Sequence, residues 1–161
     1  MSTYTDLRDS IVAIMQGIPD IGMVHGKVRY AADMTRYLDL FKVTLGGTPQ
    51  IRGWTVTRES MDVSPSSFTS ASNEEIYNMI IRGMVGLSDA LDTEATLQDL
   101  ADEVVHTLNT HTDMGISTVV DYSPAAHIRL FEVRQFGSVL CHYCEIEFSV
   151  EVRRAVTFVA N

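Results

Sequence analysis

The clearest pattern in the chain is a strict alternation of apolar and polar positions from Leu140 to Val152. Successive side chains of a strand point to opposite faces, so this period predicts one long β-strand with a buried face and a wet face. At ~3.3 Å per residue the strand is about 40 Å long, about twice the length of a common strand. The positions on the apolar face are Leu140, His142, Cys144, Ile146, Phe148, Val150 and Val152.

Such a strand is as long as the whole domain is wide, because the usual size of a compact chain of this length gives a diameter of about 40 Å. One strand therefore crosses the entire domain or extends beyond it. A strand that extends beyond its domain exposes backbone donors and acceptors, which something must cover. The pattern favours a protein that assembles over one that works through a pocket.

A helical period marks two further segments, Thr3–Gly17 and Thr93–Thr110. Their apolar side chains recur every three or four residues, which is typical of a helix that buries one stripe. The stripe of the second helix predicts a core position for Leu97, Leu100, Ala101, Val104 and Leu108. We expect both helices to pack on one face of the sheet that contains the long strand.

The other segments predict strands and one more helix. Strands are expected over residues 23–30, 51–61, 74–87, 118–121, 127–135 and 139–156, and a helix over 31–45. Glu74-Glu75 after Asn73 could equally begin a helix, but the β-branched and glycine content of that segment favours a strand.

Residues Val63–Asn73 are small and polar, which predicts a long loop that becomes ordered only when a partner binds. Its candidate partner-binding residues are Ser64, Ser66, Phe68 and Ser70.

Because hairpins predominate in this order, the sequence predicts an α+β fold. We expect an antiparallel twisted sheet, helices packed on one face and a long C-terminal β-hairpin. The 161 residues form one domain by length, residues 1–161. No apolar run approaches the roughly 18 residues of a membrane span, and the N-terminus does not predict a signal peptide. The cytoplasm is the default compartment.

The net charge and the reactive side chains disfavour nucleic-acid binding, metal binding and catalysis as functions. The net charge is −9 and the 12 Lys and Arg residues are scattered, which disfavours direct binding to a phosphate backbone. Cys141 and Cys144 are three positions apart on a strand, face opposite ways and are expected to be free buried or half-buried thiols. The histidines lack metal-ligand spacing, and no serine elbow or phosphate loop occurs. The sequence therefore predicts no catalytic residue, no metal and no cofactor.

Three carboxylates share the polar face of the long strand: Glu145, Glu147 and Glu151. The commoner interpretation is a solvated sheet face. The other is that several copies of the chain line an acidic, water-filled channel, because crowded like charges need water and salt to screen them. Trp54, directly after Gly53, is expected to anchor the core, with an interface position as the alternative.

Taken in order, these segments resemble the tail terminator proteins of long-tailed bacteriophages, small α+β proteins that form a ring at the head-proximal end of the tail tube. The resemblance covers essentially the whole chain and rests on layout more than on a diagnostic motif. Its carriers are Pro19-Asp20-Ile21-Gly22 with Val24-His25, then Arg29-Tyr30, Gly53-Trp54-Thr55-Val56-Thr57-Arg58, Tyr77 leading to Gly83 and Leu87-Ser88-Asp89, the helix from Thr93, and the terminal hairpin.

The resemblance implies a hexameric ring without catalysis, part of the virion tail or neck after assembly in the host cytoplasm. It implies contacts with the tail tube protein on one side and a head-completion or connector protein on the other. DNA would pass through without specific binding, and Glu145, Glu147 and Glu151 would face the lumen. One alternative is a neighbouring head–tail joining (neck) protein. Another alternative is a small cytosolic α+β module that binds a ligand or acts as an enzyme. This alternative would be favoured if a pocket brought together His25, His127 and His142.

Overall fold

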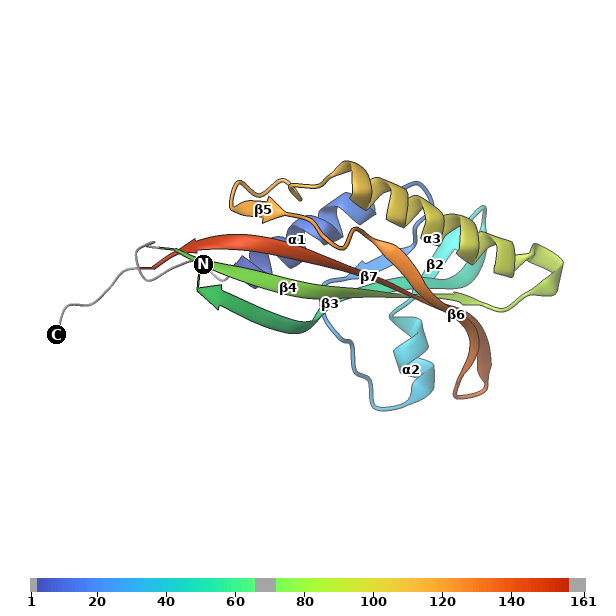
Figure 1. Cartoon of the computed structure of the whole chain (residues 1–161). Helices are drawn as coiled ribbons and strands as arrows, with labels where there is room; N and C mark the ends of the chain where they lie inside the picture. Colours follow the sequence, from blue (N-terminus) through green and yellow to red (C-terminus); the bar gives the residue numbers. More distant parts are fainter. Residues whose placement is uncertain (1–2, 66–71, 157–161) are drawn as a thin grey trace.

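Three helices and seven strands are present in the computed structural model, which describes residues 3–65 and 72–156 (Figure 1). The α+β class expected from the sequence is confirmed. The helices are α1 (Thr3–Gln16), α2 (Met34–Asp39) and α3 (Thr93–Thr110), and a 3₁₀ turn spans Asp89–Leu91. The strands are β1 (Met23–His25), β2 (Lys42–Leu45), β3 (Thr48–Pro65), β4 (Ser72–Gly86), β5 (Val119–Asp121), β6 (His127–Phe136) and β7 (Val139–Ala155).

The sheet has the order β1-β3-β4-β7, and β6 and β5 share the remaining edge of β7. All its pairings are antiparallel except one, because β1 runs parallel to β3. The expectation of a purely antiparallel sheet is therefore wrong. The reason is the connection: residues 26–47, with α2 and β2, carry the chain back far enough for β3 to start in the direction of β1.

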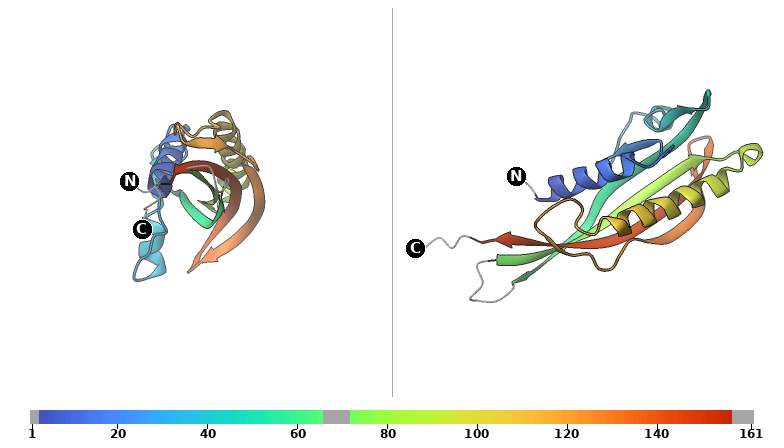
Figure 2. Two further views of the ribbon diagram at one scale, coloured as in Figure 1. Left: turned by 60° about the vertical axis from the view of Figure 1, so that its left-hand side comes forward. Right: turned by 90° about the horizontal axis from the view of Figure 1, so that it is seen from above.

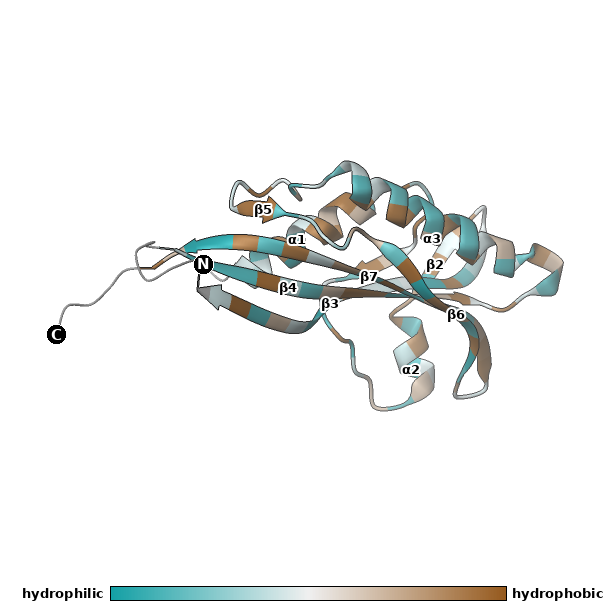
Figure 3. Ribbon diagram, viewed as in Figure 1, coloured by the Kyte–Doolittle hydropathy of each residue, from teal (hydrophilic) through white to brown (hydrophobic). Residues whose placement is uncertain are grey.

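The alternating segment found in the sequence is the long strand β7. It has 17 residues, so it is about 56 Å long. It pairs with β4 along almost its whole length, from Gly86↔Cys141 to Ser72↔Ala155. Figure 3 shows the change of hydrophobic and polar positions along both strands. Together with β3 these strands give the molecule its elongated shape (Figure 2).

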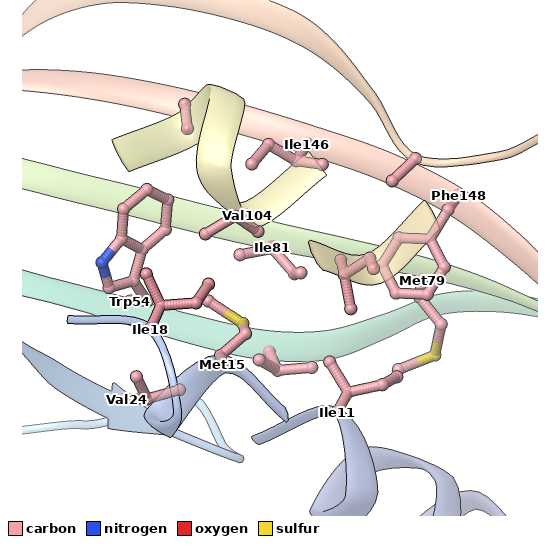
Figure 4. Close-up of a cluster of buried hydrophobic side chains, with 14 of the residues drawn as sticks. Ile11, Met15, Ile18, Val24, Trp54, Met79, Ile81, Val104, Ile146 and Phe148 are labelled. Atoms are coloured by element: carbon pink, nitrogen blue, oxygen red, sulfur yellow. The ribbon is translucent and has the colours of Figure 1, made fainter. Parts of the chain in front are cut away.

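One face of the sheet, which we name the helix face, carries α1 and α3 (Figures 1 and 2). Ile11 and Met15 of α1 and Val104 of α3 are fully buried there against Ile81 and Ile146 of the sheet (Figure 4). The predicted stripe of α3 is buried along its whole length. Apolar burial of this extent is the main stabilising contribution of the fold.

Trp54 lies in this core without any exposure, and its indole Nε1 donates to the Ile21 carbonyl oxygen at 2.9 Å. The predicted core anchor is confirmed. Its ring lies over Gly83 of the neighbouring strand, where a Cβ atom would stand 2.3 Å from the ring carbon Cζ3. Only glycine leaves room for the indole at this position.

The opposite face of the sheet, which we name the polar face, is covered at one end by α2. Leu38 and Phe41 pack there against Met84 and Cys141. Packing of all helices on one face was expected, and α2 departs from it because two strands present apolar side chains on this side. Gly53 admits Phe41 as Gly83 admits Trp54, since a Cβ at Gly53 would lie 2.2 Å from the Phe41 ring.

The segment between β1 and β3 also differs from the sequence expectation. The strand predicted over residues 23–30 ends at His25, and the helix predicted over 31–45 spans only Met34–Asp39. Lys42–Leu45 forms β2 instead, a hairpin with β3. Gly46 and Gly47 have φ angles of +57° and +79°, and two consecutive positive φ angles are what a tight hairpin turn requires.

Candidate assembly surfaces

A network of opposite charges lies in the middle of the polar face. Glu145 of β7 stands between Arg82 of β4 and Arg129 of β6, with N–O distances of 3.8 and 3.7 Å. Arg129 also forms an ion pair with Glu147, and the Tyr143 hydroxyl donates to Glu145 at 2.8 Å. Glu145 is only 8% exposed as a result. Its carboxylate is satisfied within the chain.

The three predicted carboxylates thus differ from one another. The expectation of a solvated position is wrong for Glu145, because side chains from both neighbouring strands cover it. Glu147 is half-buried and shares Arg129. Glu151 lies farther along β7, beside Glu74 and Asp121. Its pKa is raised mainly because the side chain is partly buried, and also because these two carboxylates are close to it. Glu147 and Glu151 are therefore the two that present negative charge to the surface.

The candidate partner-binding loop is shorter than expected. β3 continues to Pro65 and β4 begins at Ser72, so both ends of the predicted loop are strand. Ser64 lies in β3 opposite Glu74, and its assignment to a loop is wrong. Pairing with a neighbouring strand overrides the loop-like composition here. Ser66, Phe68 and Ser70 lie outside the described residues.

The two longest unpaired strand edges within residues 3–65 and 72–156 belong to β3 and β6. The outer edge of β3 is covered by β2 and β1 only as far as Thr55, and β6 pairs with β7 alone. Each edge carries a register shift, at Arg58/Ser60 and at Ile128/Leu130, and several charged side chains. Bulges and charges on an edge oppose the addition of another strand. Contacts through side chains are therefore favoured over extension of the sheet.

Exposed apolar side chains gather in several places among the described residues, and we name three of these groups. The loop patch, between β1 and α2, contains Val28, Tyr30 and Met34. The tip patch, at the far end of β3, contains Met61 and Val63, and the arm patch, on the β6–β7 hairpin, contains Phe131, Val133 and Leu140. Single exposed apolar residues are ordinary, whereas groups of them mark interaction surfaces. The alternation of β7 predicted a buried position for Leu140, which is exposed in the arm patch, and the sequence made no prediction of burial for Phe131 and Val133.

A groove of about 210 Å³ lies beside the arm patch, on the helix face. Leu97 of α3, almost fully buried, contributes to its lining, with Phe131 and Val133 on the β6 side and Glu94 and Gln98 on the helix side. His142 of β7 also lines it. The groove is mainly apolar and has an acidic residue at its helix side.

The histidines named for the alternative function lie apart. His25 on β1 places Nε2 2.9 Å from the Leu40 carbonyl oxygen and its ring edge-on to Phe41. His127 pairs with Glu147, five residues along β7 from His142, which is about 16 Å along the strand. No group of His, Cys, Asp and Glu suited to a metal ion occurs among the described residues.

The two cysteines are buried and free, as expected. Cys144 belongs to the core of the helix face and Cys141 to the cluster under α2. Burial raises the pKa of Cys141 to about 11 and that of Cys144 to about 12, so neither carries a thiolate at neutral pH.

No protein-family model matches the chain, and no curated protein matches its sequence. Among the helices described, none has the length and apolar character needed to span a membrane.

Proposed function

We propose that this protein is a structural protein of a tailed bacteriophage: a tail terminator that assembles into a ring, caps the tail tube and joins it to the head or neck. Its partners are further copies of itself, the tail tube protein and a head-completion or connector protein. The proposal combines the layout of the sequence with the surface of the folded chain.

The observation that carries the proposal is the presence of separate, dissimilar apolar patches on one elongated chain. The loop patch lies in the connection from β1 into α2 on the polar face, the arm patch lies on β6 and β7 beside the helix-face groove, and the tip patch lies at the far end of β3. Patches that differ from one another favour head-to-tail contacts, which close into a ring when the rotation fits. The six copies and the place at the end of the tail come from the family resemblance.

The charge of the chain agrees with a passage for DNA. A net charge of −9 and few basic residues give a surface that repels a phosphate backbone. Glu147 and Glu151 supply negative charge along β7 on the polar face, which we assign to the lumen. Glu145 supports that surface from within through Arg82 and Arg129.

The test of the function is deletion of the gene from its phage, combined with the mass of the purified protein and negative-stain images. We expect closed rings in solution, and tails of irregular length that do not join heads when the protein is missing. Normal, head-joined tails in its absence would refute the proposal. Tails of normal length that fail to join heads would assign the chain to the neck instead.

The lumen assignment has its own test. Glu147→Lys and Glu151→Lys together, with Glu145 left in place, should slow genome delivery while particles assemble in normal number, because DNA would adhere to a basic lining. Asp99→Lys with Glu103→Lys on the exposed side of α3 makes the same charge change away from the polar face and serves as the control. Equal delivery by both variants would place the polar face outside the lumen.

A further inference from the structure

The loop patch and the groove beside α3 have complementary chemistry. Residues 26–33 leave the sheet after β1, and Tyr30 at their centre is 86% exposed. Tyrosine is among the residues that dominate binding energy at protein interfaces. Lys27 and Arg29 flank the apolar side chains, so the segment is basic within an acidic protein.

The charges on both sides form no ion pair within the described residues, and the one hydrogen bond to Glu94 comes from the neutral amide of Gln98. Lys27 and Arg29 form no ion pair with any described residue, and the same holds for Glu94 and Asp102 of α3. Glu94 lines the groove, and Asp102 lies about 80° around the helix from it. Opposite charges of this kind at the rim of an interface guide association and fix its register.

The two surfaces lie on different faces of the sheet. Residues 26–33 lead from β1 into α2 on the polar face, where Met34 lies against Gly137 of the β6–β7 turn, whereas the groove lies on the helix face between α3 and β6. The loop of a chain is therefore held away from the groove of the same chain. A second copy placed beside it can receive that loop in its groove, and each copy then offers its own loop to the next.

We propose that residues 26–33 of one copy dock in the groove between α3 and the β6–β7 hairpin of the adjacent copy. Tyr30 enters between Phe131 and Val133, over Leu97, and Lys27 and Arg29 meet Glu94 and Asp102. This contact rests on the proposed ring and specifies how neighbouring copies join. Its two halves differ, so it is a head-to-tail contact and repeats around a closed ring.

The first experiment measures assembly of the full chain by analytical ultracentrifugation. Tyr30→Ala and the charge reversal Lys27→Glu with Arg29→Glu should each weaken assembly at least about tenfold, because a buried aromatic anchor and its ion pairs are lost. The charge reversal on the groove side, Glu94→Lys with Asp102→Lys, should weaken assembly too. The two reversals combined should restore assembly, which a folding defect would not do.

The control is Glu103→Lys, a charge change on the same helix about 180° from Glu94. It should assemble like the unaltered chain. Thermal melts of all variants should agree when they are measured at a concentration too low for any of the chains to assemble, because the altered side chains are exposed or half-buried.

The second experiment is cross-linking. A chain with both Tyr30→Cys and Val133→Cys should give a ladder of covalent oligomers on oxidation, whereas Tyr30→Cys alone should stop at dimers or below. The native cysteines are buried and do not interfere.

The outcomes separate this contact from the proposed function. Intact rings of the Tyr30→Ala and charge-reversed chains, with no ladder, would overturn the contact and leave the ring in place. Cross-linked rings in a phage whose tails are normal without the protein would overturn the function and leave the contact in place. Assembly lost in the groove variant alone, with Tyr30→Ala still assembled, would also overturn the contact, since another partner would then occupy the groove.

Discussion

The two faces of β7 are stabilised in different ways although they belong to the same strand. On the helix face, Ile146, Phe148 and Val150 are excluded from water by α1 and α3. On the polar face, Glu145 is almost as well buried, but ion pairs and a hydrogen bond hold it. The apolar side chains stabilise the fold in proportion to the area they bury, and an unpaired charge among them is strongly unfavourable. The buried ion pairs contribute only while every partner is present, because loss of one partner leaves an unpaired charge.

The largest effect is expected where a charge enters the helix face. Val104→Asp places a carboxylate among fully buried side chains and should lower the free energy of unfolding by about 4 kcal/mol. Chemical denaturation would measure it. Ala95→Asp, on the exposed side of the same helix, should cost less than about 0.5 kcal/mol. An unchanged melt for Val104→Asp would contradict the packing of α3 on the sheet.

A smaller loss of stability is expected when a substitution overfills the core of the helix face without introducing a charge. Gly83→Ala brings a methyl group to within 2.3 Å of the Trp54 ring and should cost about 2 kcal/mol, because the indole must move in a filled core. The matched control is Gly86→Ala on the same strand, where the new methyl would lie 3.4 Å from the Ile51 Cβ. Similar stability of the two variants would show that the indole moves freely. Tryptophan fluorescence would report the displacement.

The smallest effects compare two carboxylates on the polar face. Glu145→Gln removes the charge that Arg82 and Arg129 share and should cost about 1 kcal/mol. Glu151→Gln should instead raise the melting temperature slightly at neutral pH, because a raised folded-state pKa means that the charged form is disfavoured in the folded chain.

The pH dependence checks the sign of the Glu151 effect. The unfavourable contribution is fully present above the folded-state pKa of Glu151 and disappears as the pH falls to the ordinary glutamate value of about 4.3. The gain from Glu151→Gln should therefore vanish on acidification, as measured by thermal melts from pH 7 to pH 4. A gain that persists at pH 4 would have another origin.

The same contrast explains what the sequence could predict. The stripes of α1 and α3 and the alternation of β7 are local periods, so each could be recognised from its own segment. The burial of Glu145 depends on Arg82 and Arg129, which lie far away in the sequence and meet it only when β4, β6 and β7 are side by side. No local period contains that information.

The errors around β1 and α2 have a related cause. Parallel pairing of Met23–His25 with β3 depends on the path of the whole connection, whereas hairpins are set by neighbouring residues. Gly46 and Gly47 form a two-residue hairpin turn, which makes the preceding four residues a strand rather than the end of a helix. The loop patch and the groove were missed because exposure of single apolar residues has no signature in the sequence.

Cys141 and Cys144 provide one internal probe for each side of β7. A thiol reagent reaches Cys141 only when α2 lifts from the sheet, and it reaches Cys144 only when α1 and α3 separate from the helix face. Each rate of modification therefore measures a local opening equilibrium, in the way that amide hydrogen exchange does for the backbone. The two thiols thus allow the local stability of the two faces of the sheet to be measured separately in one molecule.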